Sequence, residues 1–213
     1  MTTAAARTQS IQSSKAAPAV GEAINVRIIA DINASIMDVV RATRGVYFMA
    51  INAMLISRHA GQRSKGFAVV SSELRVFSRN MERIMAEMET LMQELTRDTA
   101  VCQKARREQR QLQAATDATQ CCPDWLAQVM SRKTSALQSR EQALARSSQR
   151  LAVLVHRALR TCTVGVALSR SGKIEAVYGG DVAGQLNQVS EQAEQIVGHA
   201  LDILKSLEKR ITL

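Results

Sequence analysis

The sequence has few of the residues that break helices or fill thick cores. Of its 213 residues only two are proline, Pro18 and Pro123, and aromatic residues make up 3%. Because proline interrupts helices, the long stretch between these positions favours an all-α fold. The few aromatic residues indicate a thin aliphatic core, and they argue against a platform of rings for stacking single-stranded bases.

Residue patterns that support catalysis or metal binding are also missing. Three histidines lie far apart, and four cysteines lack the CxxC or HxxxH spacing of common metal sites. The sequence has no phosphate-binding P-loop and no GxSxG nucleophile motif. We therefore expect a protein that is not an enzyme and that has no cofactor and no metal site.

Long apolar runs are the third absence. No stretch of 18 apolar residues is free of charge, and the first twenty residues lack the apolar centre of a signal peptide. We therefore expect no transmembrane segment, a cytoplasmic location and reduced thiols. Residues 1–20 are small and polar, which predicts a disordered arm before a helical rod at 21–213.

The charge is strongly basic. The 28 Lys and Arg residues exceed the 19 Asp and Glu residues, which gives a formal net charge of +9. Nucleic acid and an anionic membrane surface are therefore open as partners. The basic residues are spread along the chain, so a solvated basic face is the favoured interpretation and nucleic-acid binding is not.

Apolar residues recur every three or four positions over four segments, the spacing of helices that pack at shallow angles. We predict helices over about 22–58, 67–119, 124–177 and 181–211. In the second helix the predicted stripe is Phe67, Val70, Leu74, Phe77, Met81, Ile84, Met88, Leu91 and Leu95. In the first helix it is Ile28, Ile32, Ser35, Val39, Ala42, Val46, Met49, Ala53 and Ile56.

Two glycine-containing turns set the expected topology. One is HAGQRSKG (His59–Gly66), and the other contains Gly179 and Gly180. The two middle helices are predicted to be equally long, about 80 Å at 1.5 Å per residue, so both turns should lie at one end. We predict a long antiparallel four-helix coiled-coil bundle of two hairpins. CCPDW (Cys121–Trp125) and both termini would lie toward the other end, with Trp125 closing the bundle there.

The stretch at 50–75, AINAMLISRHAGQRSKGFAVVSSELR, resembles the tip of the signalling hairpin of bacterial methyl-accepting chemotaxis proteins. The run GFAVVSSELR directly after a helical turn is the most specific part of the likeness. The positions shared with the usual pattern of that family are Ala50, Asn52, Ala53, Ala60, Gly61, Gly66, Phe67, Ala68, Val69, Val70, Glu73 and Arg75.

The resemblance implies a signalling rod whose tip docks a chemotaxis coupling protein and a histidine kinase, and it implies association with other receptors or self-association. Where the family usually has Glu, Arg and Glu, this chain has Ile56, His59 and Gln62. These differences leave open a derived helical scaffold, or a modulator of receptor arrays, that controls no kinase. Both a monomer and a homodimer remain open.

Two sets of candidate site residues follow from the resemblance. The partner-binding set at the tip is Asn52, Ile56, His59, Gln62, Arg63, Lys65, Phe67, Val69, Glu73 and Arg75. Phe67, Val70 and Leu74 also belong to the predicted stripe, which favours a buried role for them. The candidate methylation sites are the Glu/Gln pairs Glu108 and Gln109, Glu141 and Gln142, and Glu191 and Gln192.

Overall fold

The computed structural model describes residues 26–119 and 123–211, and within these ranges it contains no strand. The elements are α1 (Val26–His59), the 3-10 turn η1 (Gly61–Ser64), α2 (Lys65–Thr119), α3 (Asp124–Ala176), the 3-10 turn η2 (Val177–Val182) and α4 (Ala183–Ile211). The all-α prediction is confirmed. The predicted arm at 1–20, the start of the first helix and the two adjacent cysteines lie outside the described residues.

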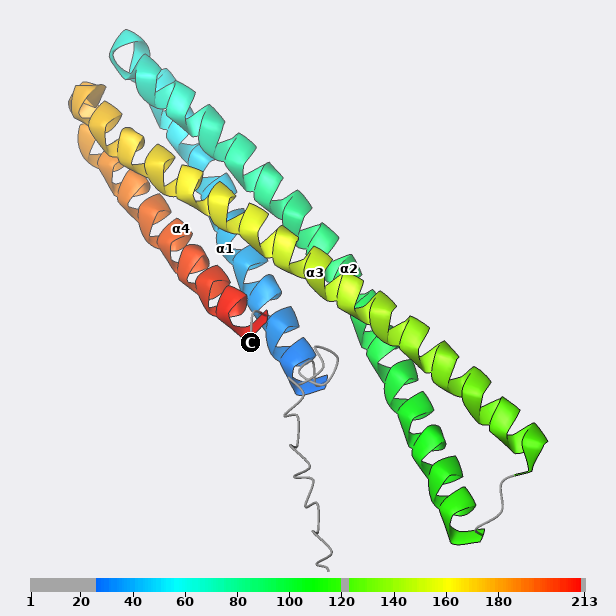
Figure 1. Ribbon diagram of the computed structural model, residues 1–213. Coiled ribbons are helices and arrows are strands. Elements are labelled where there is room, and N and C mark those ends of the chain that lie inside the picture. The colour runs from blue at the N-terminus through cyan, green and yellow to red at the C-terminus, as the bar shows by residue number, and fades with distance from the viewer. Residues whose placement is uncertain (1–25, 120–122, 212–213) are drawn as a thin grey trace, which may run out of the picture.

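The helices pack as two antiparallel hairpins, α1 with α2 and α3 with α4. The hairpins meet through α1 against α4 and through α2 against α3. Figure 1 shows the η1 turn (cyan) and the η2 turn (gold) at the same end of the molecule. The rod therefore has one end where both turns lie and another where α2 leads to α3.

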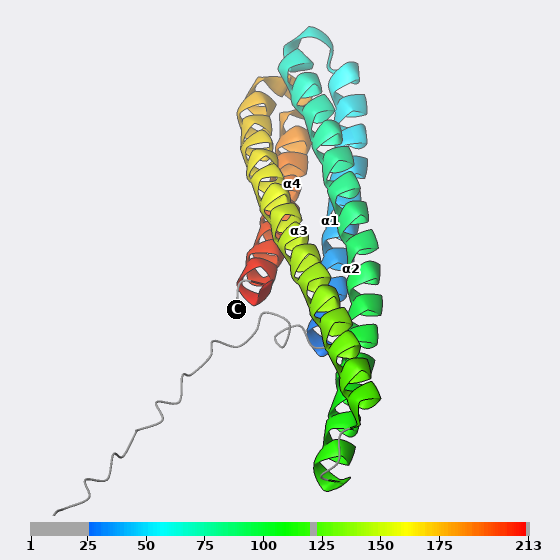
Figure 2. The ribbon, with the colours of Figure 1, turned by 45° about the vertical axis from the view of Figure 1, so that its right-hand side comes forward.

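The two ends of the rod differ in thickness. α1 and α4 have 34 and 29 residues, whereas α2 and α3 have 55 and 53. The described ends of α1 and α4 consequently lie part-way along the rod, and α2 and α3 continue as a helix pair (Figures 1 and 2). The two chain termini, which were expected toward the far end, lie outside the described residues. Trp125 is 66% exposed there, so it does not close the bundle as predicted.

The core follows the apolar pattern of α2 and departs from that of α1. All nine residues of the α2 stripe predicted above are buried, from Phe67 to Leu95. In α1 every second buried residue lies one position later in the sequence than predicted. The buried residues are Ile29, Ile32, Ile36, Val39, Thr43, Val46, Ala50, Ala53 and Ser57. The physical reason is that α1 contacts both α2 and α4, so its buried face is wider than a seam against one helix.

α3 approaches its neighbours through small buried residues, which are Ala158, Cys162, Gly165, Ser169, Gly172 and Ala176. The ring of Phe77 on α2 occupies the space beside Gly165, where a Cβ would lie 2.6 Å from the ring. Gly172 packs in the same way against Ser190 of α4 and Val70 of α2. Gly165 and Gly172 are thus interior positions of a continuous helix that require small residues.

Candidate functional site

The tip of the first hairpin is a tight turn with a polar interior. Gly61 has a φ of 69°, a conformation that favours glycine. Ser57 at the end of α1 and Ser64 in η1 are both buried and hydrogen-bonded to each other. Between them Arg58, His59, Gln62 and Arg63 are exposed, so the tip presents the side chains of the turn to solvent.

Seven of the ten predicted partner-binding residues are exposed at this tip: Asn52, His59, Gln62, Arg63, Lys65, Val69 and Glu73. Ile56 and Arg75 are half-buried. Val69 is the large apolar residue of the set that solvent reaches most, with 63% of its surface exposed. The exposed part of the predicted surface therefore combines one valine with mostly basic and neutral polar groups.

Phe67 lies in the interior, with 1% of its surface exposed. It packs with Ala53 of α1, Ala176 of α3 and Leu186 of α4. A side chain that joins all four helices in this way holds the two hairpins together at the tip. The structure thus places Phe67 in the core, as the apolar stripe predicted, and away from the partner-binding surface.

Arg75 is directed toward α1. Its guanidinium group lies 5.9 Å from the centre of the Tyr47 ring, and its Nη1 donates a hydrogen bond to Met54 Sδ at 3.9 Å. A hydrogen bond from Arg79, together with the charges of Arg79 and Arg75, lowers the pKa of Tyr47 despite some desolvation. Arg75 therefore ties α1 to α2 just below the tip.

The tip of the second hairpin lies against the first. η1 contacts η2, and the guanidinium group of Arg63 lies over Gly180, which has a φ of 59°. The carboxylate of Glu175 lies against Gly66 in the first turn of α2, where a larger residue would collide with it. A carboxylate is favourable at this place because the N-terminus of a helix carries partial positive charge.

The second tip adds exposed apolar residues that the sequence analysis missed. Ile174, Val177 and Tyr178 are 64%, 75% and 65% exposed. Because Gly172 packs on Val70 in the antiparallel register, Ile174 lies near the level of Val69. The sequence signal for this surface was a group of large apolar residues immediately before the turn that contains Gly179 and Gly180. The segment was interpreted as an ordinary packed helix, so these residues were not predicted to be exposed.

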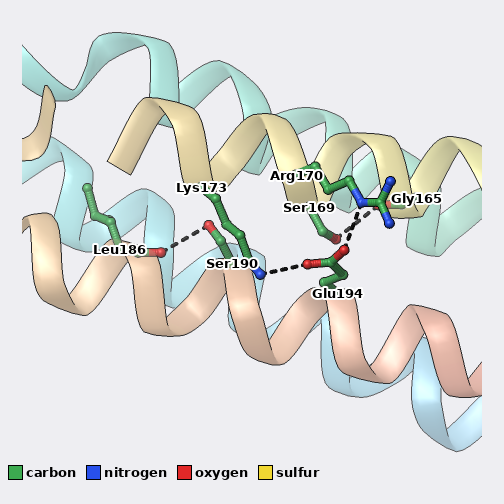
Figure 3. A network of polar contacts seen from close by, with 7 residues as sticks. All are labelled: Gly165, Ser169, Arg170, Lys173, Leu186, Ser190 and Glu194. Atoms are coloured by element: carbon green, nitrogen blue, oxygen red, sulfur yellow. Dashed lines mark hydrogen bonds and ion pairs between the residues drawn. The ribbon is translucent and has the colours of Figure 1, made fainter. Parts of the chain in front are cut away.

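A polar network holds α4 to α3 next to this end (Figure 3). The carboxylate of Glu194 accepts hydrogen bonds from Arg170 at 2.8 Å and from Lys173 at 2.7 Å. These two hydrogen bonds lower the pKa of Glu194. Ser169 and Ser190 lie beside the network, and each donates a hydrogen bond to the carbonyl group four residues earlier in its own helix. These contacts thus hold α3 and α4 together directly below the second tip.

The candidate methylation pairs fall in different surroundings. Glu141 is half-buried and 2.7 Å from Arg106, and Glu108 is 3.1 Å from Lys133, so both join α2 to α3 in the far part of the rod. Gln109 donates a hydrogen bond to Thr134 at 3.1 Å. Gln142, Glu191 and Gln192 are exposed. The far parts of α2 and α3 are therefore joined through polar as well as apolar contacts. Of the three candidate methylation pairs, Glu191 and Gln192 are the most accessible to solvent.

The described residues contain no group of three His, Cys, Asp or Glu side chains that would hold a metal ion. Two segments, Ile28–His59 and Asp124–Ile211, contain windows long and apolar enough to cross a membrane. Core helices of soluble proteins meet the same criterion. This finding therefore assigns no location to the chain, and the cytoplasmic location and the lack of a transmembrane segment remain predictions.

No family model and no curated protein matches this chain. The likeness of residues 50–75 to the chemoreceptor tip therefore rests on the residues quoted above.

Proposed function

We propose that the chain is a chemoreceptor-like signal-transduction protein that docks a chemotaxis coupling protein, a histidine kinase or both through its tip. The observation that supports this most is the position of Val69, Lys65 and Glu73, which belong to the chemoreceptor-like run and its turn and are exposed at the end of the rod. Exposed apolar side chains surrounded by charged ones are the usual composition of docking sites for partner proteins.

The fold expected from the resemblance is part of the same proposal. In chemoreceptors two identical hairpins form a four-helix coiled-coil bundle. Here one chain would supply both hairpins, with a second tip that differs from the first. Ile174, Val177 and Tyr178 would then belong to the docking surface together with Val69, so the partner would contact both turns.

Signalling would operate by a shift between alternative packings of the bundle, biased by partner binding. The buried hydroxyl groups of Ser71 and Ser78 on α2 have no hydrogen-bond partner in the part of the chain that the structure describes. A buried hydroxyl group without a partner destabilises the packing in which it is buried, relative to a packing in which it finds a hydrogen bond. These positions near the tip are where we expect packing to change.

The test is to measure binding of the purified chain to a chemotaxis coupling protein by biolayer interferometry. Val69→Glu and Val177→Glu should each weaken binding at least tenfold, because each places a charge in the apolar part of the surface. Val101→Glu is the matched control, since Val101 is 41% exposed on the same helix but far from the tip. Absence of binding by the unaltered chain, or equal binding by all three variants, would refute the proposal.

A second candidate is a derived scaffold or array modulator that controls no kinase. The observation that favours it is chemical: Ile56, His59 and Gln62 carry neither carboxylate nor guanidinium groups where chemoreceptors usually have them. This candidate predicts that the chain binds an array of receptors, coupling protein and kinase while leaving phosphate incorporation by the kinase unchanged. A change in kinase activity upon addition of the chain would rule it out.

A further inference from the structure

The outer groove between α2 and α3 contains two hollows away from the two turns. One has a volume of about 620 Å³ and is lined on its apolar side by Leu91, Val153 and Leu154. The other, nearer the tip, has a volume of about 400 Å³ and is lined by Val76 and Val164 among others. Val76, Val153 and Val164 are each between 46% and 64% exposed. The α2–α3 groove therefore has an apolar floor that neither α1 nor α4 covers.

The two hollows follow one another along the same pair of helices. An ion pair between Glu87 of the first hollow and Arg157 of the second, 3.3 Å long, stands between them. Both side chains are more than 40% exposed, so the pair adds little stability and opens readily. From Glu73 to Glu94 the two hollows follow α2 for about 30 Å, the length of a helix of about 20 residues.

The edges of the α2–α3 groove carry more positive than negative charge. The α3 edge has Arg146, Arg150, Arg157 and Arg160. The α2 edge has Glu73, Glu87 and Glu94. By the three-to-four spacing, Arg83, one turn before Glu87, and Arg97, one turn after Glu94, fall on the same side of α2. Among the described residues, the ion pair to Glu87 is the only one made by the four α3 arginines. At least three cations thus remain available to a partner.

We propose that the α2–α3 groove docks an acidic amphipathic helix of a partner protein. The apolar floor matches the i, i+3, i+4 and i+7 side chains of such a helix, and the arginines match acidic residues on its flanks. The apolar floor disfavours nucleic acid, because a phosphate backbone has no apolar face that would cover it. A second copy of the chain is disfavoured because two net positive grooves would face each other.

A designed peptide tests the proposal directly. The probe is a fluorescein-labelled 21-residue helix with leucine at heptad positions a and d and glutamate on the flanks. One control peptide has lysine in place of glutamate, and a second has the same residues as the probe in scrambled order. Fluorescence anisotropy should show binding of the probe that weakens as salt is raised, and at least tenfold weaker binding of both controls.

Variants locate the site. Arg146→Glu combined with Arg150→Glu, and separately Val153→Asp, should each weaken probe binding at least tenfold. Lys205→Glu combined with Lys209→Glu is the matched control, because it makes the same change in net charge on α4 at exposed positions outside the groove. Glu87→Gln should tighten binding two- to fivefold by freeing Arg157. Circular dichroism melts confirm that each variant is folded.

Three results would overturn the proposal. Equal binding of the scrambled peptide would indicate general attraction between opposite charges. Equal loss in the α4 control variant would place the site elsewhere. Binding of duplex DNA that is as tight as that of the probe and sensitive to the same arginines would identify the arginine edge as a nucleic-acid surface. Loss of tip docking in Val177→Glu leaves the peptide result unchanged, so the two proposals fail independently.

Discussion

Ser57 and Ser64 close the first turn with reciprocal hydrogen bonds. The hydroxyl group of Ser57 donates to the carbonyl oxygen of Ser64 at 2.7 Å, and the hydroxyl group of Ser64 donates to the carbonyl oxygen of Ser57. Both residues are nearly inaccessible to solvent. Two short polar side chains thus satisfy backbone groups that the end of α1 and the turn would otherwise leave without partners.

Replacement of Ser57 by alanine should destabilise the protein by about 1–2 kcal/mol, because a buried carbonyl group loses its donor. Ser72→Ala is the control, since Ser72 is exposed on α2. Urea denaturation followed by circular dichroism measures both. Equal unfolding midpoints for the two variants would show that the paired hydrogen bonds add nothing.

Gly165 and Gly198 should respond to alanine in opposite directions. A Cβ at Gly165 would lie 2.6 Å from the Phe77 ring, whereas nothing lies within 4 Å of a Cβ at Gly198. We expect Gly165→Ala to lower the free energy of unfolding by about 1 kcal/mol, since overpacking outweighs the gain in helix propensity. Gly198→Ala should raise it by up to about 1 kcal/mol.

The same denaturation experiment checks both glycine variants, and Phe77→Leu combined with Gly165→Ala should recover part of the loss. A stabilising Gly165→Ala variant would contradict the contact between α3 and the Phe77 ring.

The charge of Glu194 should make the free energy of unfolding depend on pH in the acidic range. Its hydrogen bonds to Arg170 and Lys173 lower its pKa in the folded protein, so its contribution is present above the pKa of the unfolded chain, near 4.5. The contribution is lost as pH falls from there through the lowered pKa of the folded state. The difference in unfolding free energy between the unaltered protein and Glu194→Gln should therefore be constant above pH 5.5 and shrink toward pH 3.

Glu191→Gln is the control for this experiment, because Glu191 is exposed on the same helix and makes no ion pair among the described residues. A Glu194→Gln difference that is independent of pH would contradict the role of charge in the contact.

Cys162 should react slowly with thiol reagents. Burial raises its pKa to about 12, and burial also raises the pKa of Cys102. Because the thiolate is the reactive form, little of either residue is reactive at pH 8. In a variant with serine at 121 and 122, iodoacetamide labelling in native buffer should be at least tenfold slower than in 6 M guanidinium chloride. Rapid native labelling of Cys162 would show that α3 separates from its neighbours.

Trp125 reports on the far end of the rod. It is the only tryptophan in the chain, and two thirds of its surface is exposed. Its fluorescence should therefore resemble that of free tryptophan in buffer and be quenched by iodide in the native protein. A blue-shifted, protected emission would indicate that a partner or a second copy covers this end.

The sequence by itself determined where the helices and turns lie. The three-to-four spacing from Phe67 to Leu95 and the glycines at 61 and 180 act locally, because helix periodicity and positive φ angles depend on neighbours along the chain. Pro123 likewise precedes α3 as predicted, with its carbonyl group accepting the first hydrogen bonds of that helix. These features were predictable without knowledge of any contact between helices.

Only the tertiary structure decided which tip residues face solvent. Arg75 is on a chemoreceptor-like motif, but its contacts to Tyr47 and Met54 turn it toward α1. The equal lengths of the two middle helices already predicted that the second turn lies at the end of the rod that carries Val69. That Ile174, Val177 and Tyr178 are exposed there follows only from the packing of α3 against its neighbours. The physical reason is that exposure at a helix surface depends on how many neighbouring helices cover it, and spacing along one helix does not specify those neighbours.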